Sequence, residues 1–250
     1  MSGHSKWSTI KRKKGKADQE RGRLFSKIIR ELTVAAREGG GDPDGNPRLR
    51  GAIEAARAAN MPAANIDKAV KRGTGELPGV SYEEQTYEGY GPQGVAILIE
   101  VLTDNKNRTT AEIRHILTKH GGHLGEVGCV SWMFHLKGSI VIDKGKASED
   151  EIMAAALEAG AEDVSDEGQF FDVSTAPGDL ESVKAALAKS GMEFTSAQLI
   201  RDPQTVIKLE GKQAIQVLRL MDTLEEQDDV QKVYANFDVP DEIMEELGKE

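Results

Sequence analysis

The segment ADQERGRLFSKIIRELTVAARE occupies residues 17–38 and has two distinct faces when it is wound as a helix. Leu24, Ile28 and Leu32 fall on one apolar stripe, because residues three or four positions apart share a side of a helix. The next five residues, GGGDP, end such a helix, since Gly accepts left-handed dihedrals and Pro cannot continue the hydrogen-bond ladder. The segment is therefore predicted to bury one face and to present a cationic one, made of Arg23, Lys27, Arg30 and Arg37.

Helical patterns continue on the C-terminal side of this segment. One runs over residues 47–59, with Leu49 and Ile53 facing inward, and another over 62–72, with Pro62 placed in its first turn. Three short helices joined by tight turns predict a small bundle, and Gly73-Thr74-Gly75 reads as the hinge that follows it. On the N-terminal side, residues 1–16 form a basic tail too poor in apolar residues to fold by itself.

The two parts of the chain carry opposite charge. Residues 1–72 hold 17 Lys and Arg against 8 Asp and Glu, a net charge of +9, whereas residues 73–250 hold 15 against 34, a net charge of -19. Like charges gathered on each side oppose compaction, so this split gains nothing for folding and is better explained by a partner. A polyanion, and nucleic acid first among polyanions, fits the basic end.

The candidate nucleic-acid contacts are the cations of the tail and of the first two helices, together with one aromatic side chain. Trp7 lies among cations, which suits stacking on an unpaired base, but it could equally anchor the tail to the helical bundle. The helical cations could likewise form an ordinary solvated face. The predicted contacts are Lys6, Trp7, Lys11, Arg12, Lys13, Lys14, Arg23, Lys27, Arg30, Arg37, Arg48 and Arg50.

Beyond the hinge, strand and helix patterns alternate. Strands at 82–87, 95–102 and 127–134 and a helix at 109–120 come first. Between residues 137 and 201 the order is strand, helix, strand, strand, helix, strand, the split βαβ plan of a ferredoxin-like domain. A strand at 206–209, a helix at 212–224 and a strand at 230–236 then complete the sheet begun near residue 82.

The expected fold class is α+β and multidomain: an N-terminal three-helix domain precedes two α/β domains, one of them ferredoxin-like and inserted in the other. The expected boundaries are residues 1–75 for the tail and bundle, 76–136 with 204–240 for the first α/β domain, 137–203 for the inserted domain and 241–250 for a C-terminal tail.

Other motifs give weaker signals. Residues 104–109, DNKNRT, join a strand to a helix, so Lys106, Asn107 and Arg108 form a candidate anion site, while capping by Asn107 or Thr109 explains the same residues. Gly89-Tyr90-Gly91-Pro92-Gln93-Gly94 fits G-x-G-x-x-G, but a β-rich run follows it, so it is predicted to be a hairpin turn and not a dinucleotide site. The acidic run at 222–229 is most simply a solvated helix end.

The chain shows no pattern that marks a catalytic or metal centre. His115, His120 and His123 have no shared helical face, the single cysteine, Cys129, has no thiol partner, and no nucleophile motif or P-loop is found. We therefore expect no catalytic residue, no metal, no cofactor and no small-molecule substrate, although an active site can be assembled from residues far apart in sequence. One cysteine and no long apolar segment or secretory signal predict a cytoplasmic protein that does not enter a membrane.

Long strings of this sequence resemble the YebC/PmpR family, which includes the mitochondrial translational activator of cytochrome c oxidase. The resemblance covers essentially the whole chain, and Ser8-Thr9, where Ala-Asn is common, is a minor departure. The matching strings are GHSKW at 3–7, DPDGNPRLRGAIEAARAANMP at 42–62, YEGYGPQGVA at 87–96, TDNKNRT at 103–109, GGHLGEVGCVSWMF at 121–134 and DDVQKVYANFD at 228–238.

The resemblance implies a three-domain protein that acts without catalysis. Family members are commonly named probable transcriptional regulators that bind DNA, and others are similar to ribosome-associated factors that help translation through proline runs. The expected function is thus a non-enzymatic, nucleic-acid-binding regulator of gene expression of the DNA-binding kind. The alternative is a translation factor that contacts ribosomal or transfer RNA on the ribosome, and an enzymatic role for the α/β domains is the competing class.

Overall fold

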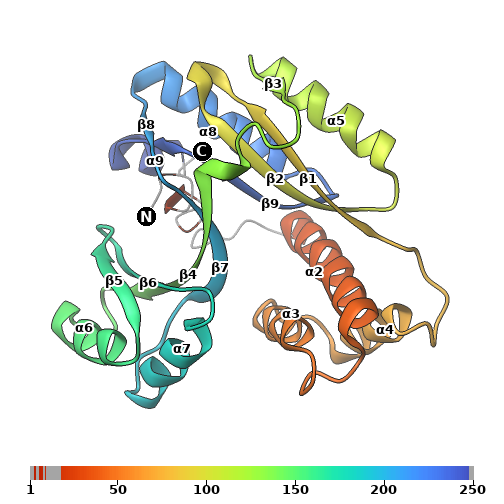
Figure 1. The fold of residues 1–250 in the computed structure, drawn as a ribbon, viewed down its shortest axis with the longest axis horizontal. Coiled ribbons are helices and arrows are strands. Elements are labelled where there is room, and N and C mark those ends of the chain that lie inside the picture. The colour runs from red at the N-terminus through yellow and green to blue at the C-terminus, as the bar shows by residue number, and fades with distance from the viewer. Residues whose placement is uncertain (1–2, 4–5, 8, 10–17, 248–250) are drawn as a thin grey trace.

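The computed structural model describes Gly3, Lys6, Trp7, Thr9 and residues 18–247 (Figure 1). The helical bundle projects from one side of two sheet-containing units, and α2 is the helix that joins it to them (Figure 1). The mixed α/β architecture, with N-terminal helices followed by two sheet-containing units, is the one expected from the sequence.

The bundle consists of α2 (Asp18–Gly39), α3 (Pro47–Ala58) and α4 (Ala63–Gly73). Its core contains Ile28 and fully buried Leu32 of the predicted apolar stripe of α2, whereas Leu24 of that stripe is 47% exposed. Asn46 caps α3 by accepting a hydrogen bond from the Leu49 amide at 3.0 Å. Gly73 allows α4 to approach α2 closely, because a Cβ there would lie 2.4 Å from the Thr33 carbonyl oxygen. The three predicted helices are thus confirmed within a residue or two.

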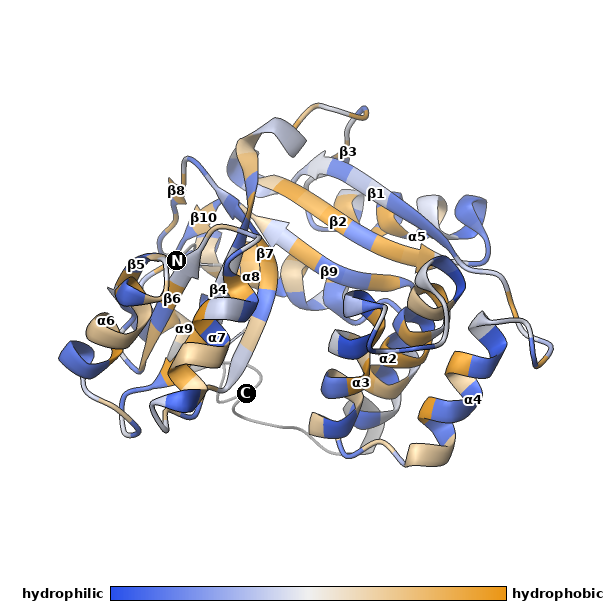
Figure 2. Ribbon diagram, turned by 60° about the horizontal axis from the view of Figure 1, so that its bottom comes forward, coloured by the Kyte–Doolittle hydropathy of each residue, from blue (hydrophilic) through white to orange (hydrophobic). Residues whose placement is uncertain are grey.

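The first sheet has the strand order β3-β1-β2-β9 and is antiparallel throughout. Its central strand alternates between two cores: Ile97, Ile99 and Val101 face the helices, while Ala96 and Leu98 pack on the opposite side. In Figure 2 this strand is the most hydrophobic of its sheet. The elements are β1 (Glu83–Tyr90), β2 (Ala96–Thr103), α5 (Lys106–Lys119), β3 (His123–Leu124), α8 (Gly211–Glu225) and β9 (Val230–Ala235).

The second sheet is built from a chain segment inserted between β3 and α8. Its strand order is β5-β6-β4-β7, and α6 and α7 pack on it, as in a ferredoxin-like unit. The insertion predicted from the order of elements is confirmed. The elements are β4 (Phe134–Asp143), α6 (Glu149–Glu158), β5 (Ala161–Asp166), β6 (Phe170–Thr175), α7 (Leu180–Lys189) and β7 (Ser196–Pro203).

Three local predictions are wrong. Residues 127–133 form a loop and the short 3-10 helix η2 (Ser131–Met133), and only Phe134 of the predicted strand lies in a strand, at the start of β4. The segment at 206–209 yields β8 (Ile207–Lys208), which pairs with β10 (Phe237–Asp238) outside the main sheet. The expected C-terminal tail contains α9 (Asp241–Leu247), whose Met244 is buried in the main core.

The loop before β4 is held by a buried carboxylate. Glu88, which is 5% exposed, accepts hydrogen bonds from the amides of Gly128, Val130 and Ser131 at 2.7, 2.7 and 2.8 Å. Burial by itself raises the pKa of Glu88, but these amides outweigh it and hold the pKa below its ordinary value. These bonds take the place of a strand ladder, which explains why the β-rich sequence forms no strand here.

The inserted sheet contains a buried acid that should make stability depend on pH. Asp172 is 5% exposed and accepts a bond from the Ser139 hydroxyl at 2.5 Å, and burial raises its pKa to about 6. The folded protein therefore binds this proton more tightly than the unfolded chain, so stability falls as pH rises from about 4 to 6. Thermal melting should show Asp172→Asn raising Tm by a few degrees at pH 7, with no difference from the unmodified protein near pH 4.

Asp166→Asn is the matched control for this prediction. Hydrogen bonds from Lys144 and from the Gly168 amide hold the pKa of Asp166 below its ordinary value. Replacing this carboxylate should therefore not raise Tm at pH 7. An equal gain in both variants would show that the effect comes from net charge and not from burial of Asp172.

Candidate nucleic-acid interface

The cationic stripe of α2 faces the protein interior along most of its length. Arg23 forms an ion pair with Glu226 at 3.4 Å, and Lys27 donates a hydrogen bond to the Glu225 carbonyl at 2.5 Å. Arg30 pairs with Asp229 at 2.7 Å and also contacts the Asp228 carbonyl. The prediction that Arg23, Lys27 and Arg30 form a free face is therefore wrong, because a turn of the same molecule engages all three: carboxylates pair with Arg23 and Arg30, and a main-chain carbonyl accepts from Lys27.

That acidic turn is the segment between α8 and β9. Its sequence, EEQDD at 225–229, was expected to be a solvated helix end, and instead Glu225, Glu226, Asp228 and Asp229 all take part in contacts with α2. The physical reason is that the turn, about 200 residues later in the chain, packs beside α2, so that its carboxylates meet the arginines of the helix. Helix and turn together fasten the bundle to the first sheet.

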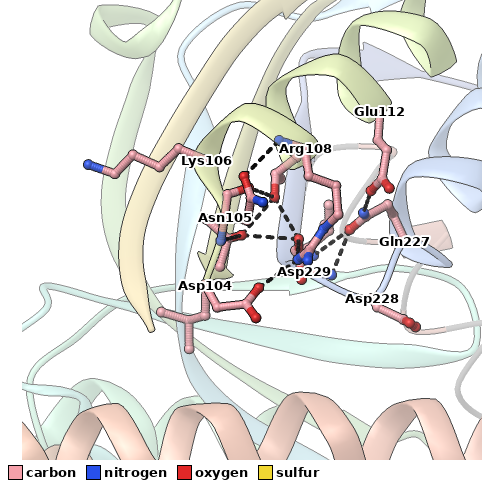
Figure 3. A network of polar contacts seen from close by, with 12 residues as sticks. Asp104, Asn105, Lys106, Arg108, Glu112, Gln227, Asp228 and Asp229 are labelled. Atoms are coloured by element: carbon pink, nitrogen blue, oxygen red, sulfur yellow. Dashed lines mark hydrogen bonds and ion pairs between the residues drawn. The ribbon is translucent and has the colours of Figure 1, made fainter. Parts of the chain in front are cut away.

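Asp229 is the centre of this joint (Figure 3). Its side chain is 2% exposed and accepts bonds from Arg30, Arg108 and the hydroxyls of Thr103 and Thr109, at 2.7, 2.7, 3.1 and 2.5 Å. Burial alone raises the pKa of Asp229, but these bonds and the charge of Arg30 outweigh it and hold the pKa below its ordinary value. The joint ties α2, the end of β2, the start of α5 and the turn before β9 to one carboxylate, which we call the Asp229 joint.

The candidate anion site belongs to the same network. Arg108 is occupied by Asp104 and Asp229, and Lys106 pairs with Glu83 at 2.7 Å, while Asn107 is exposed. Asn105, and neither Asn107 nor Thr109, caps α5 by accepting a bond from the Arg108 amide at 3.1 Å. The anion-site prediction is therefore wrong: carboxylates of the chain already fill the place that an anion would take.

Trp7 and Lys6 also have structural partners. Trp7 is 2% exposed in the main core, and its indole N–H donates to Asp222 of α8 at 3.1 Å. Lys6 pairs with Asp241 of α9 at 2.7 Å. The base-stacking interpretation of Trp7 is wrong. Trp7 does anchor the N-terminal segment, as the alternative proposed, but it is buried in the first α/β unit and not in the bundle.

Of the two cations predicted on α3, Arg48 is paired with carboxylates and Arg50 is exposed. Arg48 bonds to Glu31 and Glu38 at 2.7 Å each and contacts Glu84 of β1. Its burial lowers the pKa, and the pairs with Glu31 and Glu84 outweigh that and raise it. Arg50 donates to the Pro43 carbonyl at 3.1 Å with its side chain exposed, and exposed Arg37 donates to Ser81 at 2.8 Å. The tail predictions, Lys11, Arg12, Lys13 and Lys14, lie outside the described residues.

Four exposed cations of the outer helices remain without a carboxylate partner in the described part of the chain. Sequence reasoning named only Arg50 as a site, although the i, i+7 and i, i+4 spacings on α3 and α4 would have found the others. Glu54, between the two α3 arginines, is itself engaged by Lys184 of α7 at 2.9 Å. We call this set the bundle cations: Arg50, Arg57, Lys68 and Arg72.

The other motifs play structural parts. Residues 89–94 form the predicted hairpin turn, with the Gly91 amide bonded to the Val95 carbonyl and Gln93 at a φ of 62°. Within residues 18–247 and the four described residues before them, no three His, Cys, Asp or Glu side chains are grouped as a metal site requires. In the same set of residues, no helix combines the length and hydropathy needed to cross a bilayer.

Comparison with known proteins places these features in a family. Residues 5–76 match the model of the TACO1/YebC N-terminal domain, and residues 82–237 match that of the TACO1/YebC second and third domain. A "probable transcriptional regulatory protein" of Syntrophus aciditrophicus is 60% identical over 249 residues, covering 99% of this chain and all of that protein. A protein of Geobacter sulfurreducens with the same description is 58% identical over 247 residues, with the same coverage.

A solved structure is also similar. The crystal structure of a conserved hypothetical protein from Aquifex aeolicus is 49% identical, with a TM-score of 0.84 that covers 91% of this chain and 94% of that one. The three-unit arrangement described above is therefore shared with an experimental structure.

Proposed function

This chain belongs to the TACO1/YebC family, and we propose that it is a non-enzymatic regulator of transcription that binds DNA through its helical bundle. The relatives' description as probable transcriptional regulatory proteins supports the role in transcription. The observation that carries the mode of binding is the set of bundle cations. A regulator of this kind acts where the DNA is, in the cytoplasm.

The distribution of charge orients the protein on DNA. Residues 73–250 carry a net charge of -19, and phosphates repel them within a Debye length of about 8 Å at physiological salt. Figure 1 places α3 and α4 toward the end of α2 that points away from the first sheet. The far end of the bundle (Figure 1) can therefore reach a duplex, while the Glu54–Lys184 pair keeps one side of α3 against the inserted unit.

The contacts are made to phosphates and not to base edges. Contacts to phosphates position a protein on the duplex without reading sequence, whereas sequence is read by side chains that reach base edges in the major groove. Three of the four cations predicted on α2, Arg23, Lys27 and Arg30, are engaged within the chain, so the duplex is expected to lie along α3 and α4.

Absence of catalysis is part of the proposal. The carboxylates with the most perturbed surroundings, Glu88, Asp172 and Asp229, are each engaged by structural partners. The partners are backbone amides for Glu88, the Ser139 hydroxyl for Asp172 and arginines for Asp229, which fix these carboxylates within the fold.

The test is the salt dependence of duplex binding. Four phosphate contacts give a slope of about -3.6 in log K against log salt, which weakens binding roughly 150-fold between 50 and 200 mM. Changing all four bundle cations to Gln should remove this contribution of about -3.6 to the slope, because the four phosphate contacts that release counterions from the DNA are no longer made. Fluorescence anisotropy with a 30-bp duplex of mixed sequence measures both quantities.

The control removes the same charge from the α/β units. Arg114, Lys119, Lys189 and Lys208 are exposed and have no carboxylate partner among the described residues, so their change to Gln matches the first variant in net charge. Its slope should stay close to that of the unmodified protein. Equal loss in the two variants, or an unchanged slope in the first, contradicts binding through the bundle.

A further inference from the structure

A groove lies between the bundle and the segment that leads into the first sheet. It has a volume of about 420 Å³ and is formed by α2, α4 and the extended residues before β1. This is the place where the bundle hinge passes into the α/β unit. Its lining residues are Ile29, Thr33, Arg72, Pro78, Gly79, Val80 and Tyr82.

The walls of the groove are apolar and aromatic. Ile29, Pro78 and Val80 supply hydrocarbon, and Val80 is 51% exposed. Tyr82 is half-buried, and the Arg30 guanidinium lies 5.4 Å from the centre of its ring. Arg30 is fixed in turn by Asp229, so the phenol ring has a rigid neighbour and a defined position. A flat aromatic ligand is what such a wall accommodates best.

The rim of the groove carries one cation. The stem of Arg72 packs against Gly79, where a Cβ would lie 3.1 Å from the Arg72 Cβ, and its head is exposed. Nearby carboxylates are engaged elsewhere: Asp67 by Lys71 at 2.9 Å, and Glu76 by the Thr74 hydroxyl at 2.9 Å. Among the described residues Arg72 has no acidic partner, and a guanidinium in this state can bind a phosphate through two parallel hydrogen bonds.

An aromatic wall beside an unpaired arginine fits one chemical class. A nucleotide supplies a flat base for the wall and a phosphate for Arg72, while an apolar side chain from a protein would leave the arginine without a partner. Bases in a duplex are stacked on their neighbours and cannot enter a groove, so the ligand must be an unpaired nucleotide. We propose that the groove holds one unpaired nucleobase of a single strand or loop, with its phosphate on Arg72. The proposal rests on the proposed function, because it assumes that the bundle binds nucleic acid.

The experiment measures the affinity of the protein for three nucleic acids by fluorescence anisotropy at fixed salt. They are a 12-nucleotide oligothymidine, an abasic strand of the same length and a 12-bp duplex. The unmodified protein should bind oligothymidine more tightly than the abasic strand. Tyr82→Leu should weaken oligothymidine binding by roughly 5- to 150-fold, the range that stacking of one base supplies, and change duplex and abasic binding less than about twofold. Thermal melting of the variant confirms that it is folded.

Two further variants distinguish the contribution of Arg72 at the rim of the groove from the general effect of removing one positive charge. Arg72→Gln should weaken oligothymidine more than duplex, whereas Arg57→Gln, which removes an exposed cation outside the groove, should weaken both equally. If Tyr82→Leu folds and leaves oligothymidine affinity unchanged, or if the abasic strand binds as well as oligothymidine, the groove proposal is overturned while duplex binding still stands. If the unmodified protein binds none of the three strands, the proposed function fails as well.

Discussion

Replacing Asp229 with alanine should lower the free energy of unfolding by about 3–5 kcal/mol. The side chain is 2% exposed and holds Arg30, Arg108 and two threonine hydroxyls, so its removal leaves two guanidinium groups without their main partner. Breaking a buried pair by removing one member costs more than the pair itself contributes, because the remaining charge is still desolvated. Urea unfolding followed by circular dichroism measures the loss.

The pH dependence of this loss is fixed by the direction of the pKa shift. The pKa of Asp229 is held below 3.8, so its contribution is complete above that value and disappears as pH falls through the lower folded-state pKa. The difference between the two proteins should therefore be constant from pH 5 to 8 and should shrink in strong acid.

Asp228→Ala is the matched control for the joint. It removes the same chemical group one residue earlier, but the Asp228 side chain is exposed and only its main-chain carbonyl contacts Arg30. Its cost should stay within about 0.5 kcal/mol, the range of surface substitutions. Hydrogen exchange should also show α2 opening in the Asp229 variant alone. A loss below 1 kcal/mol for Asp229→Ala would mean that the bundle is held mainly by other contacts.

Trp7→Ala should be as damaging as loss of a central core residue, at about 3–5 kcal/mol. Trp7 is 2% exposed and belongs to the same buried cluster as Val217 and Leu220 of α8, although it lies in a segment that reads as a basic tail. The substitution opens a cavity in that cluster and leaves Asp222 without its indole donor. Denaturant unfolding of the full-length protein gives the free energy.

Trp7→Phe separates packing from hydrogen bonding. The phenyl ring keeps most of the buried area and loses only the bond to Asp222, so we expect a cost of about 1 kcal/mol. Trp132, which is 64% exposed in the loop before β4, is the other tryptophan and serves as a reference: Trp132→Ala should change stability little. If Trp7→Ala were equally mild, the indole would not be the anchor of the N-terminal segment.

The sequence predicted the elements well because periodicity is a local property. The stripe of Leu24, Ile28 and Leu32 was enough to place α2, and the alternation of strands and helices was enough for the inserted ferredoxin-like sheet. The misplaced strand at 127–134 shows the limit of such reasoning. Its residues favour β-structure, but Glu88, some 40 residues earlier, takes the amides that a strand would use.

The site was predicted less well, because charge patterns do not name their partner. Arg23, Lys27 and Arg30 form a cationic stripe in the sequence whether the partner is a phosphate backbone or the acidic turn at 225–229. The sequence did contain a signal: the turn at 225–229 carries four carboxylates, in a chain whose two parts have opposite charge. Bundle cations such as Lys68 and Arg72 were passed over because their helix is short and their charges less dense.

By itself, then, the amino-acid order determined the three helices, the inserted sheet, the family and the gathering of positive charge near the N-terminus. Those features follow from covalent geometry and from side-chain periodicity over a few turns. Only the tertiary structure decided which cations remain free, where Trp7 is buried and that a groove opens beside Tyr82. These depend on contacts between residues as far apart as Arg30 and Asp229, and such contacts are set by the path of the whole chain.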